Sequence, residues 1–304
     1  MCPAGLFHGR EPLSERGRRA ARRRHPDGPA LSDERLLDQL ADAAREAGEA
    51  ILSIVRRGFD VEAKRDRSPV TEADRAAELI ILAALARAAP GVPVIAEEEV
   101  AAGRIPAHEH TFFLVDPLDG TKEFVRGGDD YTVNIALVAD LVPRLGVVFA
   151  PATCRLHLGL VGAGAWADEG AGRRAIRTRA RAEPVTAVAS KSHFTQDTSD
   201  YLEAAVGACG HVSIGSSLKF CIVAEGEADI YPRLSPTSEW DTAAGHAVLL
   251  AAGGRVDAPD GSPLRYGKAA FLNRAFVATG GWAPPPAAPF LAPFAGGGDL
   301  PAGV

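Results

Sequence analysis

The chain has 304 residues and a mass of 31.8 kDa, which is enough for one large domain or two modest ones. Hydrophobic residues make up 46% and charged residues 24%, which excludes wholesale disorder, a collagen-like repeat and a coiled coil. The net charge of −6 combines a basic head, residues 1–30 with seven Arg against three acids, with a remainder that carries −10. Such an acidic body repels nucleic-acid polymers and suits a protein that collects cations.

The composition of the two ends sets the expected domain limits. Residues 1–30 lack apolar periodicity and residues 283–304 are rich in Pro, Gly and Ala, so we expect both to be disordered. One folded domain should therefore cover 31–282, with an N-terminal α+β subdomain at about 31–180 and a C-terminal α/β subdomain at about 184–282.

Targeting and redox signals are weak. No stretch approaches the roughly 20 apolar residues of a membrane span. The four cysteines form no CxxC pair, and no secretory signal is recognisable near the start. These features predict a cytoplasmic protein with reduced thiols, and the basic head leaves open a peripheral association with the inner face of the cell membrane.

Two helices are expected first. Ser32 can cap a helix that runs to about Arg57, because apolar residues follow it at helical spacing. After the turn at Ser68, Thr71 should begin a second helix that ends before Pro90. Asp74 falls in the first turn of this second helix, whose apolar face is expected to carry Leu79, Leu82 and Leu85.

The rest of the chain mixes strands and helices. Strands are expected at 92–96, 111–115, 131–139, 145–150, 185–189, 212–214, near Val256 and at 275–279. Helices are expected at 217–224 and 242–252, the second closed by a glycine pair. The elements show no strict βαβ alternation, which favours layered α and β structure with mostly antiparallel or mixed sheets.

The segment Asp-Pro-Leu-Asp-Gly-Thr at 116–121 carries the clearest chemical signal. A strand delivers Asp116 to the edge of a sheet, and Gly120 allows a tight turn with bare backbone N–H groups beside Thr121. Asp116 and Asp119 can face one point across this turn, with the Leu118 carbonyl as a third oxygen, and hard cations such as Mg²⁺ prefer such ligands. Taken alone, the segment is equally well explained as an ordinary turn.

Other acids follow the same pattern. Glutamates occupy residues 97–99 at the end of a strand, and Asp241 stands at the start of the last helix. Taken singly, they are typical of a solvated loop and of a helix cap. Two carboxylates about 4 Å apart repel by about 4 kcal/mol at an effective dielectric of about 20, so a shared cluster requires divalent ions.

Three ordered motifs carry a resemblance to a known family. They are Glu97 and Glu98, the segment 116–121, and Trp-Asp-Thr-Ala-Ala-Gly at 240–245. The chain resembles the lithium-sensitive, magnesium-dependent phosphatase superfamily that includes inositol monophosphatases and fructose bisphosphatases. Further stretches resemble one branch, the bacterial 3'(2'),5'-bisphosphate nucleotidases of the CysQ type: SPVTEAD at 68–74, DGTKEF at 119–124, YTVNIAL at 131–137 and SIGSSLKF at 213–220.

The resemblance implies a fold and a set of roles. The fold is a layered α+β sandwich, the sugar-phosphatase (inositol monophosphatase-like) fold of alternating helix and mixed-sheet layers. One Mg²⁺ would be bound by Glu97, Asp116 and the Leu118 carbonyl. A second would be bound by Asp116, Asp119 and Asp241. The sequence does not determine whether a third ion binds. The catalytic residues implied are Glu97, Thr121 and Asp74, with Thr121 orienting the attacking water and Asp74 supporting it.

Substrate groups are implied in the same way. The scissile phosphate would lie against Glu97, Leu118, Asp119, Gly120, Thr121 and Asp241, and the nucleotide against Ser192, His193, Ser216, Ser217, Lys219 and Arg233. For His193 and Arg233, a structural hydrogen bond and a rim salt bridge are the alternatives, and Lys219 is equally well explained as a surface lysine.

The expected reaction removes the 3'-phosphate from adenosine 3',5'-bisphosphate, with the sulfated analogue as a further substrate and a place in sulfur assimilation. Li⁺ should compete with one cation. The alternatives are an inositol-monophosphatase or fructose-1,6-bisphosphatase activity on the same scaffold, and a non-catalytic protein that binds metal or nucleotide.

Overall fold

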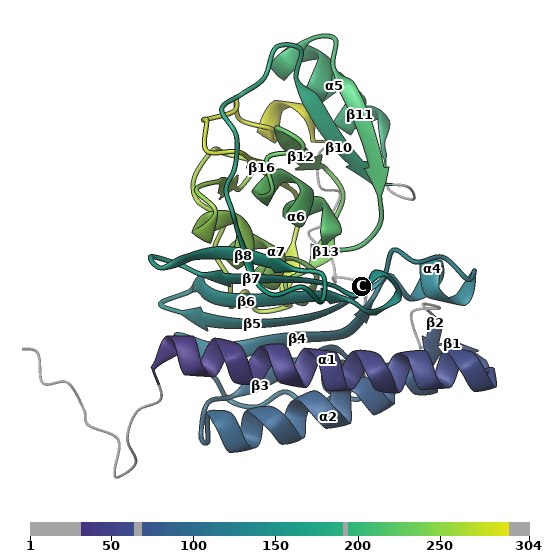
Figure 1. Cartoon of the computed structure of the whole chain (residues 1–304). Helices are drawn as coiled ribbons and strands as arrows, with labels where there is room; N and C mark the ends of the chain where they lie inside the picture. Colours follow the sequence, from purple (N-terminus) through teal and green to yellow (C-terminus); the bar gives the residue numbers. More distant parts are fainter. Residues whose placement is uncertain (1–31, 64–68, 191–193, 292–304) are drawn as a thin grey trace, which may run out of the picture. The chain divides into compact units, whose positions relative to one another are not determined.

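The computed structural model describes residues 32–63, 69–190 and 194–291, and the chain from Ser32 onward forms one unit. Helices and sheets alternate in layers, with a helix pair on the outside, a seven-stranded sheet, a second helix pair, a five-stranded sheet and a last helix (Figure 1). This arrangement confirms the predicted layered α+β fold with mixed sheets.

The outer helix pair consists of α1 (Asp33–Arg57) and α2 (Glu72–Ala88). Both caps are as predicted, since Ser32 Oγ accepts a hydrogen bond from Arg35 N at 3.3 Å and Thr71 forms a capping box with Asp74. The predicted apolar face of α2 was wrong at Leu79, which is 70% exposed. The run from 79 to 86 is apolar on every side of the helix, so its periodicity could not identify the buried face.

The seven-stranded sheet has the order β3-β4-β5-β6-β7-β8-β9, with β3 and β4 parallel and every other neighbouring pair antiparallel. Its strands are β3 (Val94–Ala96), β4 (Thr111–Asp119), β5 (Thr132–Ala139), β6 (Val142–Ala150), β7 (Arg155–Leu160), β8 (Gly164–Asp168) and β9 (Arg174–Ile176). The helices α1 and α2 cover one face of this sheet. Strands β7, β8 and β9 were not predicted from the sequence.

The central helices α6 (Leu218–Ala224) and α7 (Trp240–Ala251) cover the other face. Helix α7 lies unusually close to the sheet because glycines replace side chains beneath it. A Cβ on Gly146 would stand 2.3 Å from the Ala244 carbonyl oxygen, and one on Gly159 would stand 2.5 Å from Val248 Cα. The backbone of α7 therefore rests almost directly on β6 and β7.

Beyond these helices lies the five-stranded sheet, in the order β11-β10-β12-β16-β14. Its strands are β10 (Thr186–Ser190), β11 (Gly210–Ile214), β12 (Ile230–Arg233), β14 (Arg255–Asp257) and β16 (Phe276–Thr279). Its far face packs against α5 (Gln196–Val206), a helix that the sequence analysis missed. The shorter elements are β1 (Val61–Ala63), β2 (Pro69–Thr71), α3 (Glu97–Ala101), α4 (Thr121–Val125), η1 (Pro151–Thr153), β13 (Thr237–Ser238), β15 (Leu272–Asn273) and η2 (Ala288–Phe290).

Ordered packing continues past residue 282, where a loose tail was expected. Ala287 is fully buried, the Tyr201 hydroxyl donates to the Pro285 carbonyl at 2.9 Å, and the ring of Phe290 lies 5.4 Å from that of Tyr201. Proline restricts the unfolded chain, so ordering such a segment costs little entropy. Residues 1–31 and 292–304 lie outside the described part, so the predicted disorder there stays a prediction.

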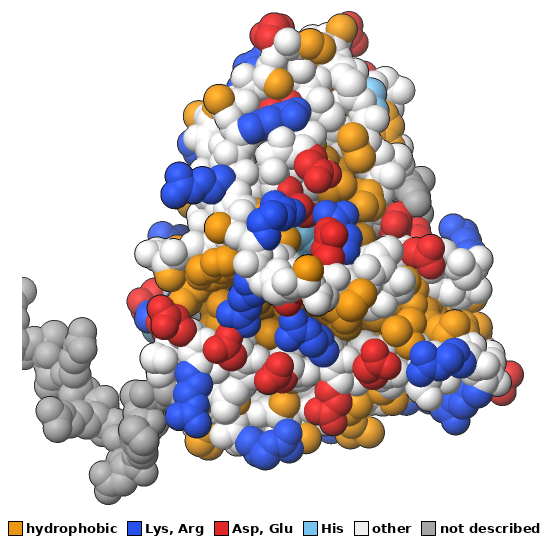
Figure 2. All heavy atoms as spheres, in the orientation of Figure 1, with side chains coloured by type: hydrophobic (Ala, Val, Ile, Leu, Met, Phe, Trp, Pro, Cys, Tyr) orange, Lys and Arg blue, Asp and Glu red, His pale blue; other side chains and the backbone are white. Residues whose placement is uncertain are grey.

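Acidic and basic side chains are interspersed on the face drawn in Figure 2. Asp33 of α1 pairs with Arg144 of β6, and Arg45 of α1 pairs with Asp168 of β8 at 2.9 Å, so ion pairs connect the outer helix to the sheet. No helix within the described ranges is both long enough and apolar enough to cross a membrane.

Candidate active site

The two aspartates of the 116–121 segment both belong to β4. The strand runs on to Asp119, four residues farther than predicted, and pairs Asp116 with Asn134 and Asp119 with Thr132 of β5. Three steps along β4 thus match two along β5, which is a β-bulge. In a regular strand, residues three apart point to opposite faces. The bulge therefore brings both aspartates opposite residues of the same face of β5.

Asp241 reaches this place from the first turn of α7. Its Oδ2 accepts hydrogen bonds from Thr237 Oγ1 and from Ser238 N, the latter at 3.1 Å. Ser217, just before α6, connects it to β4: the Ser217 hydroxyl lies 2.7 Å from the Asp241 carbonyl oxygen and 3.1 Å from Asp119 Oδ2. The starts of both central helices are therefore joined to the bulged strand.

Each of the three aspartates accepts hydrogen bonds through one carboxylate oxygen. Asp116 Oδ1 accepts from Leu118 N at 3.0 Å, and Asp119 Oδ2 and Asp241 Oδ2 accept the bonds just described. Within the described residues, Asp116 Oδ2, Asp119 Oδ1 and Asp241 Oδ1 accept no hydrogen bond. Anionic oxygens presented in this way are the donors that a hard divalent cation takes.

The charges of these carboxylates act on one another. Burial, followed by repulsion from Glu97, Asp119 and Asp241, raises the pKa of Asp116 well above its ordinary value. Burial and the charge of Asp241 raise the pKa of Asp119 to about 6, although Lys219 opposes this shift. The pKa of Asp241 is also raised, mainly by burial. A bound cation would relieve this repulsion, so the chemistry of these carboxylates suits a hard divalent cation.

The described acidic side chains do not surround a common point in this structure. Across residues 32–63, 69–190 and 194–291, no three His, Cys, Asp or Glu side chains stand close enough together to hold a metal ion. Glu97 is the first residue of α3. Its negative charge repels the aspartates and contributes to the raised pKa of both Asp116 and Asp241. The four predicted acidic ligands thus share one electrostatic neighbourhood.

Thr121 and Asp74 lie within hydrogen-bonding distance of each other. The Thr121 hydroxyl lies 3.3 Å from Asp74 Oδ1 and 3.0 Å from the Leu118 carbonyl oxygen. The other carboxylate oxygen of Asp74 accepts from the Thr71 amide at 2.7 Å and from the Thr71 hydroxyl at 2.8 Å, and Asp74 is fully buried. A capped helix start therefore holds the carboxylate that faces the threonine.

The predicted substrate groups fall into three sets. Ser216 and Ser217 precede α6, where the Ser216 hydroxyl lies 2.7 Å from Thr132 Oγ1 and Ser217 already joins the aspartates. Lys219 is only 4% exposed, and its ammonium lies 5.5 Å from the centre of the Tyr231 ring, so it is not a surface lysine. Ser192 and His193 lie outside the described residues.

Arg233, at the end of β12, also acts on this neighbourhood. Its guanidinium donates to the Pro236 carbonyl at 3.1 Å, and its charge opposes the raised pKa of Asp119 and of Asp241. The positive charge of Arg233 thus faces the aspartates rather than a distant rim, which fits a contact to an anionic ligand.

Asn134 is a residue that the sequence analysis missed. It is fully buried in β5, and its Nδ2 donates to Ser217 Oγ at 2.9 Å and to Asp119 Oδ2 at 3.3 Å. The available signal was a single amide side chain among the otherwise apolar residues 133–139, because a buried polar group needs a partner.

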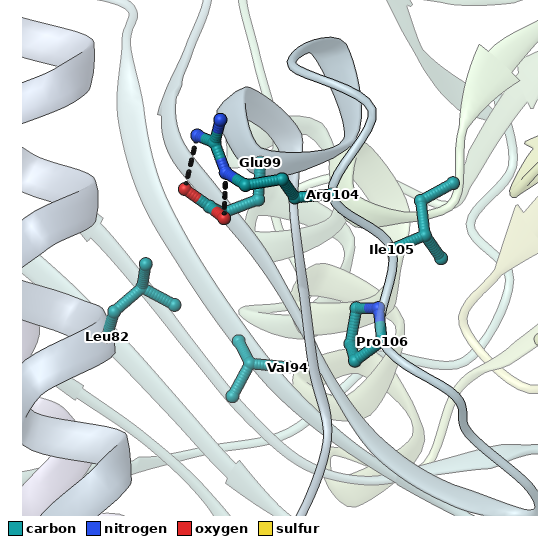
Figure 3. A pocket seen from close by; sticks show the side chains of 6 residues that line it. All are labelled: Leu82, Val94, Glu99, Arg104, Ile105 and Pro106. Carbon is teal, nitrogen blue, oxygen red and sulfur yellow. Dashed lines mark hydrogen bonds and ion pairs between the residues drawn. The ribbon is translucent and has the colours of Figure 1, made fainter.

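An apolar hollow of about 460 Å³ lies elsewhere, between α2, β3 and the loop that follows α3. In Figure 3 the ion pair of Glu99 and Arg104 stands above Leu82, Val94 and Pro106. None of the predicted site residues lines it. The predicted site residues that the structure describes therefore lie outside this hollow.

Comparison with known proteins agrees with this geometry. Residues 32–285 match the inositol monophosphatase family. The 3'(2'),5'-bisphosphate nucleotidase CysQ of Escherichia coli strain K12 is 45% identical over 244 residues, which cover 79% of this chain and 98% of that protein. The protein of the same name from Haemophilus influenzae is 30% identical over 255 residues, with 82% and 94% covered.

Two solved structures are similar throughout. The crystal structure of CysQ from Bacteroides thetaiotaomicron has a TM-score of 0.69 and 39% identity, and covers 81% of this chain and 97% of that one. The inositol monophosphatase of Anabaena has a TM-score of 0.66 and 27% identity, with 82% and 91% covered. Because the family match spans most of the sequence and the relatives are covered almost end to end, the chain belongs to the inositol monophosphatase family.

Proposed function

We propose that the chain is a 3'(2'),5'-bisphosphate nucleotidase that removes the 3'-phosphate from adenosine 3',5'-bisphosphate and, as a second substrate, from its sulfated analogue. The observation that carries the proposal is the site itself: three aspartates from β4 and α7, each with one carboxylate oxygen that accepts no hydrogen bond from the described residues, together with Thr121 and its supporting Asp74. The names of the relatives supply the substrate class.

Enzymes of this family depend on Mg²⁺ in general. In this chain, Glu97, Asp116 and the Leu118 carbonyl would hold one ion, and Asp116, Asp119 and Asp241 a second. When bound, such ions supply the positive charge that a phosphate monoester needs and lower the pKa of a nearby water. Whether a third ion binds is tested by measuring phosphate release while the Mg²⁺ concentration is varied.

Thr121 prepares the water through its hydroxyl. A hydroxyl carries a single proton, and here that proton points to Asp74 or to the Leu118 carbonyl. Its lone pairs therefore remain to accept a hydrogen bond from a water molecule, which would orient the water oxygen toward the phosphorus. The water oxygen forms the new P–O bond and the P–O bond to the 3'-oxygen breaks. One proton of the water ends on the departing 3'-oxygen and the other stays on the released phosphate, so the products are adenosine 5'-monophosphate and hydrogen phosphate.

Positive and neutral groups near the aspartates would receive the substrate. The backbone N–H groups of Gly120 and Thr121 would hold the scissile phosphate, and Lys219 and Arg233 would face the second phosphate. Ser216 would contact the nucleoside. Ser217 has a second role in this arrangement, because its hydroxyl already joins Asp119 to the start of α7.

The test is a substrate panel with varied Mg²⁺. Purified protein should release phosphate from adenosine 3',5'-bisphosphate in preference to inositol 1-phosphate and fructose 1,6-bisphosphate, and only with Mg²⁺ present. Good turnover of inositol phosphate without turnover of the nucleotide would overturn the substrate assignment. Binding of the nucleotide with no phosphate release from any ester would favour the non-catalytic alternative. The cytoplasmic location and the peripheral membrane association stay predictions.

A further inference from the structure

Asp130 lies between two loops of the site and contacts both. It belongs to the segment that joins α4 to β5, outside the acidic group described above. Its Oδ2 accepts a hydrogen bond from the Gly215 amide at 2.9 Å, in the loop that leads from β11 to α6. A carboxylate is a strong acceptor for a backbone N–H, so this contact fixes the position of the Gly215 peptide.

The Cβ and carbonyl oxygen of Asp130 also leave no room for a side chain at Gly215, and its carbonyl oxygen leaves little at Gly120. A Cβ on Gly215 would lie 2.7 Å from Asp130 Cβ and 2.8 Å from its carbonyl oxygen. A Cβ on Gly120 would lie 2.9 Å from the same oxygen, at a residue whose φ of 93° already favours glycine. Asp130 is thus packed between the catalytic turn and the loop before α6.

The loop that Asp130 holds is in a conformation the chain does not favour by itself. Ser216 has a φ of 48°, in the left-handed region that serine seldom adopts. Such a residue persists only where its surroundings fix it. Here, Asp130 holds the amide of the preceding Gly215, and the Ser216 hydroxyl lies 2.7 Å from Thr132 Oγ1.

We propose that Asp130 is a positioning residue for substrate selectivity: by holding Gly215 it places Ser216 for the nucleoside part of the substrate. The proposal rests on the proposed function, because Ser216 matters only if a nucleoside is bound there. It assigns no chemical step to Asp130. Loss of the contact should therefore weaken binding of the bisphosphate nucleotide and leave hydrolysis of a small ester without a nucleoside unchanged.

The test compares three variants with the parent. Asp130→Ala removes the acceptor, Asp130→Asn keeps an acceptor oxygen but removes the charge, and Asp129→Ala is the matched control at the exposed neighbouring position. The values of kcat and KM are measured for adenosine 3',5'-bisphosphate and for 4-nitrophenyl phosphate. We expect Asp130→Ala to raise KM for the nucleotide about tenfold. Asp130→Asn should restore most of the loss, and Asp129→Ala should match the parent.

A second readout follows the hydrogen bond itself. Exchange of the Gly215 amide with deuterated water, measured without substrate or Mg²⁺, should be faster in Asp130→Ala and close to the parent rate in Asp130→Asn. If Asp130→Ala does not fold, Asp130→Ser is used instead. Serine keeps a polar side chain at this position, but it is too short to replace the 2.9 Å contact between Asp130 Oδ2 and the Gly215 amide.

Two outcomes would overturn the proposal. One is an equal loss of kcat/KM on both esters, which would make Asp130 a support of the catalytic turn at Gly120. The other is an unchanged KM for the nucleotide while the Gly215 amide exchanges faster. Failure of the proposed function is distinguishable, because the parent itself would then release no phosphate from the nucleotide.

Discussion

Because Lys219 is buried, we predict that its charge destabilises the folded chain when no substrate or metal is bound. Burial in α6 lowers the pKa of Lys219 from 10.5 to about 8, although attraction from Asp119 opposes the shift. The gap between these two pKa values corresponds to about 3 kcal/mol. Replacing Lys219 by Met keeps a side chain of similar length without the charge, so Lys219→Met should make the substrate-free, metal-free chain more stable at pH 7 by up to that amount.

The pH dependence has a definite sign. Between about pH 8 and 10.5 the unfolded chain keeps the lysine proton that the folded chain has lost, so this group's penalty shrinks as the pH rises. Below pH 8 both states hold the proton and the penalty is complete. The difference in unfolding free energy between Lys219→Met and the parent should therefore fall from about 3 kcal/mol at pH 7 toward zero near pH 10.5.

The assay is urea denaturation in EDTA at several pH values, with Lys122→Met at an exposed position of α4 as the matched control. The same variants are then compared in phosphate release, where Lys219→Met should raise KM for the bisphosphate about tenfold or more and Lys122→Met should not. A Lys219→Met protein no more stable than the parent at pH 7 would refute the reasoning about burial.

Three further predictions follow from named contacts. Asp116→Asn should weaken Mg²⁺ binding in calorimetry and slow phosphate release by about 100-fold or more, and parent-like hydrolysis would contradict the metal-dependent reaction. Thr121→Val should lose about 100-fold in kcat while Thr121→Ser keeps most of it, because only serine retains the hydroxyl beside Asp74; equal rates would count against an oriented water. Burial alone would lower the pKa of His157, but Cys221 and the Glu225 carboxylate raise it to about 9. The stability from His157 is therefore complete below pH 6.5 and is lost as the pH rises through 9, so the stability advantage of the parent over His157→Gln should vanish over this range in denaturation experiments.

Much of the fold could be predicted because its signals are local. Ser32 and Thr71 mark helix starts through their own hydroxyls, and each is found capping its helix. The elements that were missed lack such signals. Strand β8 contains Gly164 and two alanines, and α5 begins with a run of polar residues, so neither carries a strong apolar period.

The site divides in the same way. The resemblance of three ordered acidic motifs to a known family predicted that Asp116, Asp119 and Asp241 belong together, and electrostatic repulsion requires a cation wherever such carboxylates gather. What holds them could not be predicted, because the bulge of β4 and the contact of Ser217 with the start of α7 depend on which strand and helix become neighbours. Such partners are set by tertiary packing, which leaves no periodic trace in the sequence.

The nearness of α7 to the sheet couples ordinary core packing to catalysis. Asp241 stands at the start of this helix. Gly146 and Gly159 of the sheet have no side chain, which lets the helix backbone pack directly on the strands. Even one methyl group at Gly146 must push the helix outward and move the carboxylate with it, since the interior has no slack to absorb the displacement. A substitution of Gly146 would therefore lower activity as an active-site substitution does, although it changes none of the residues proposed to contact the substrate.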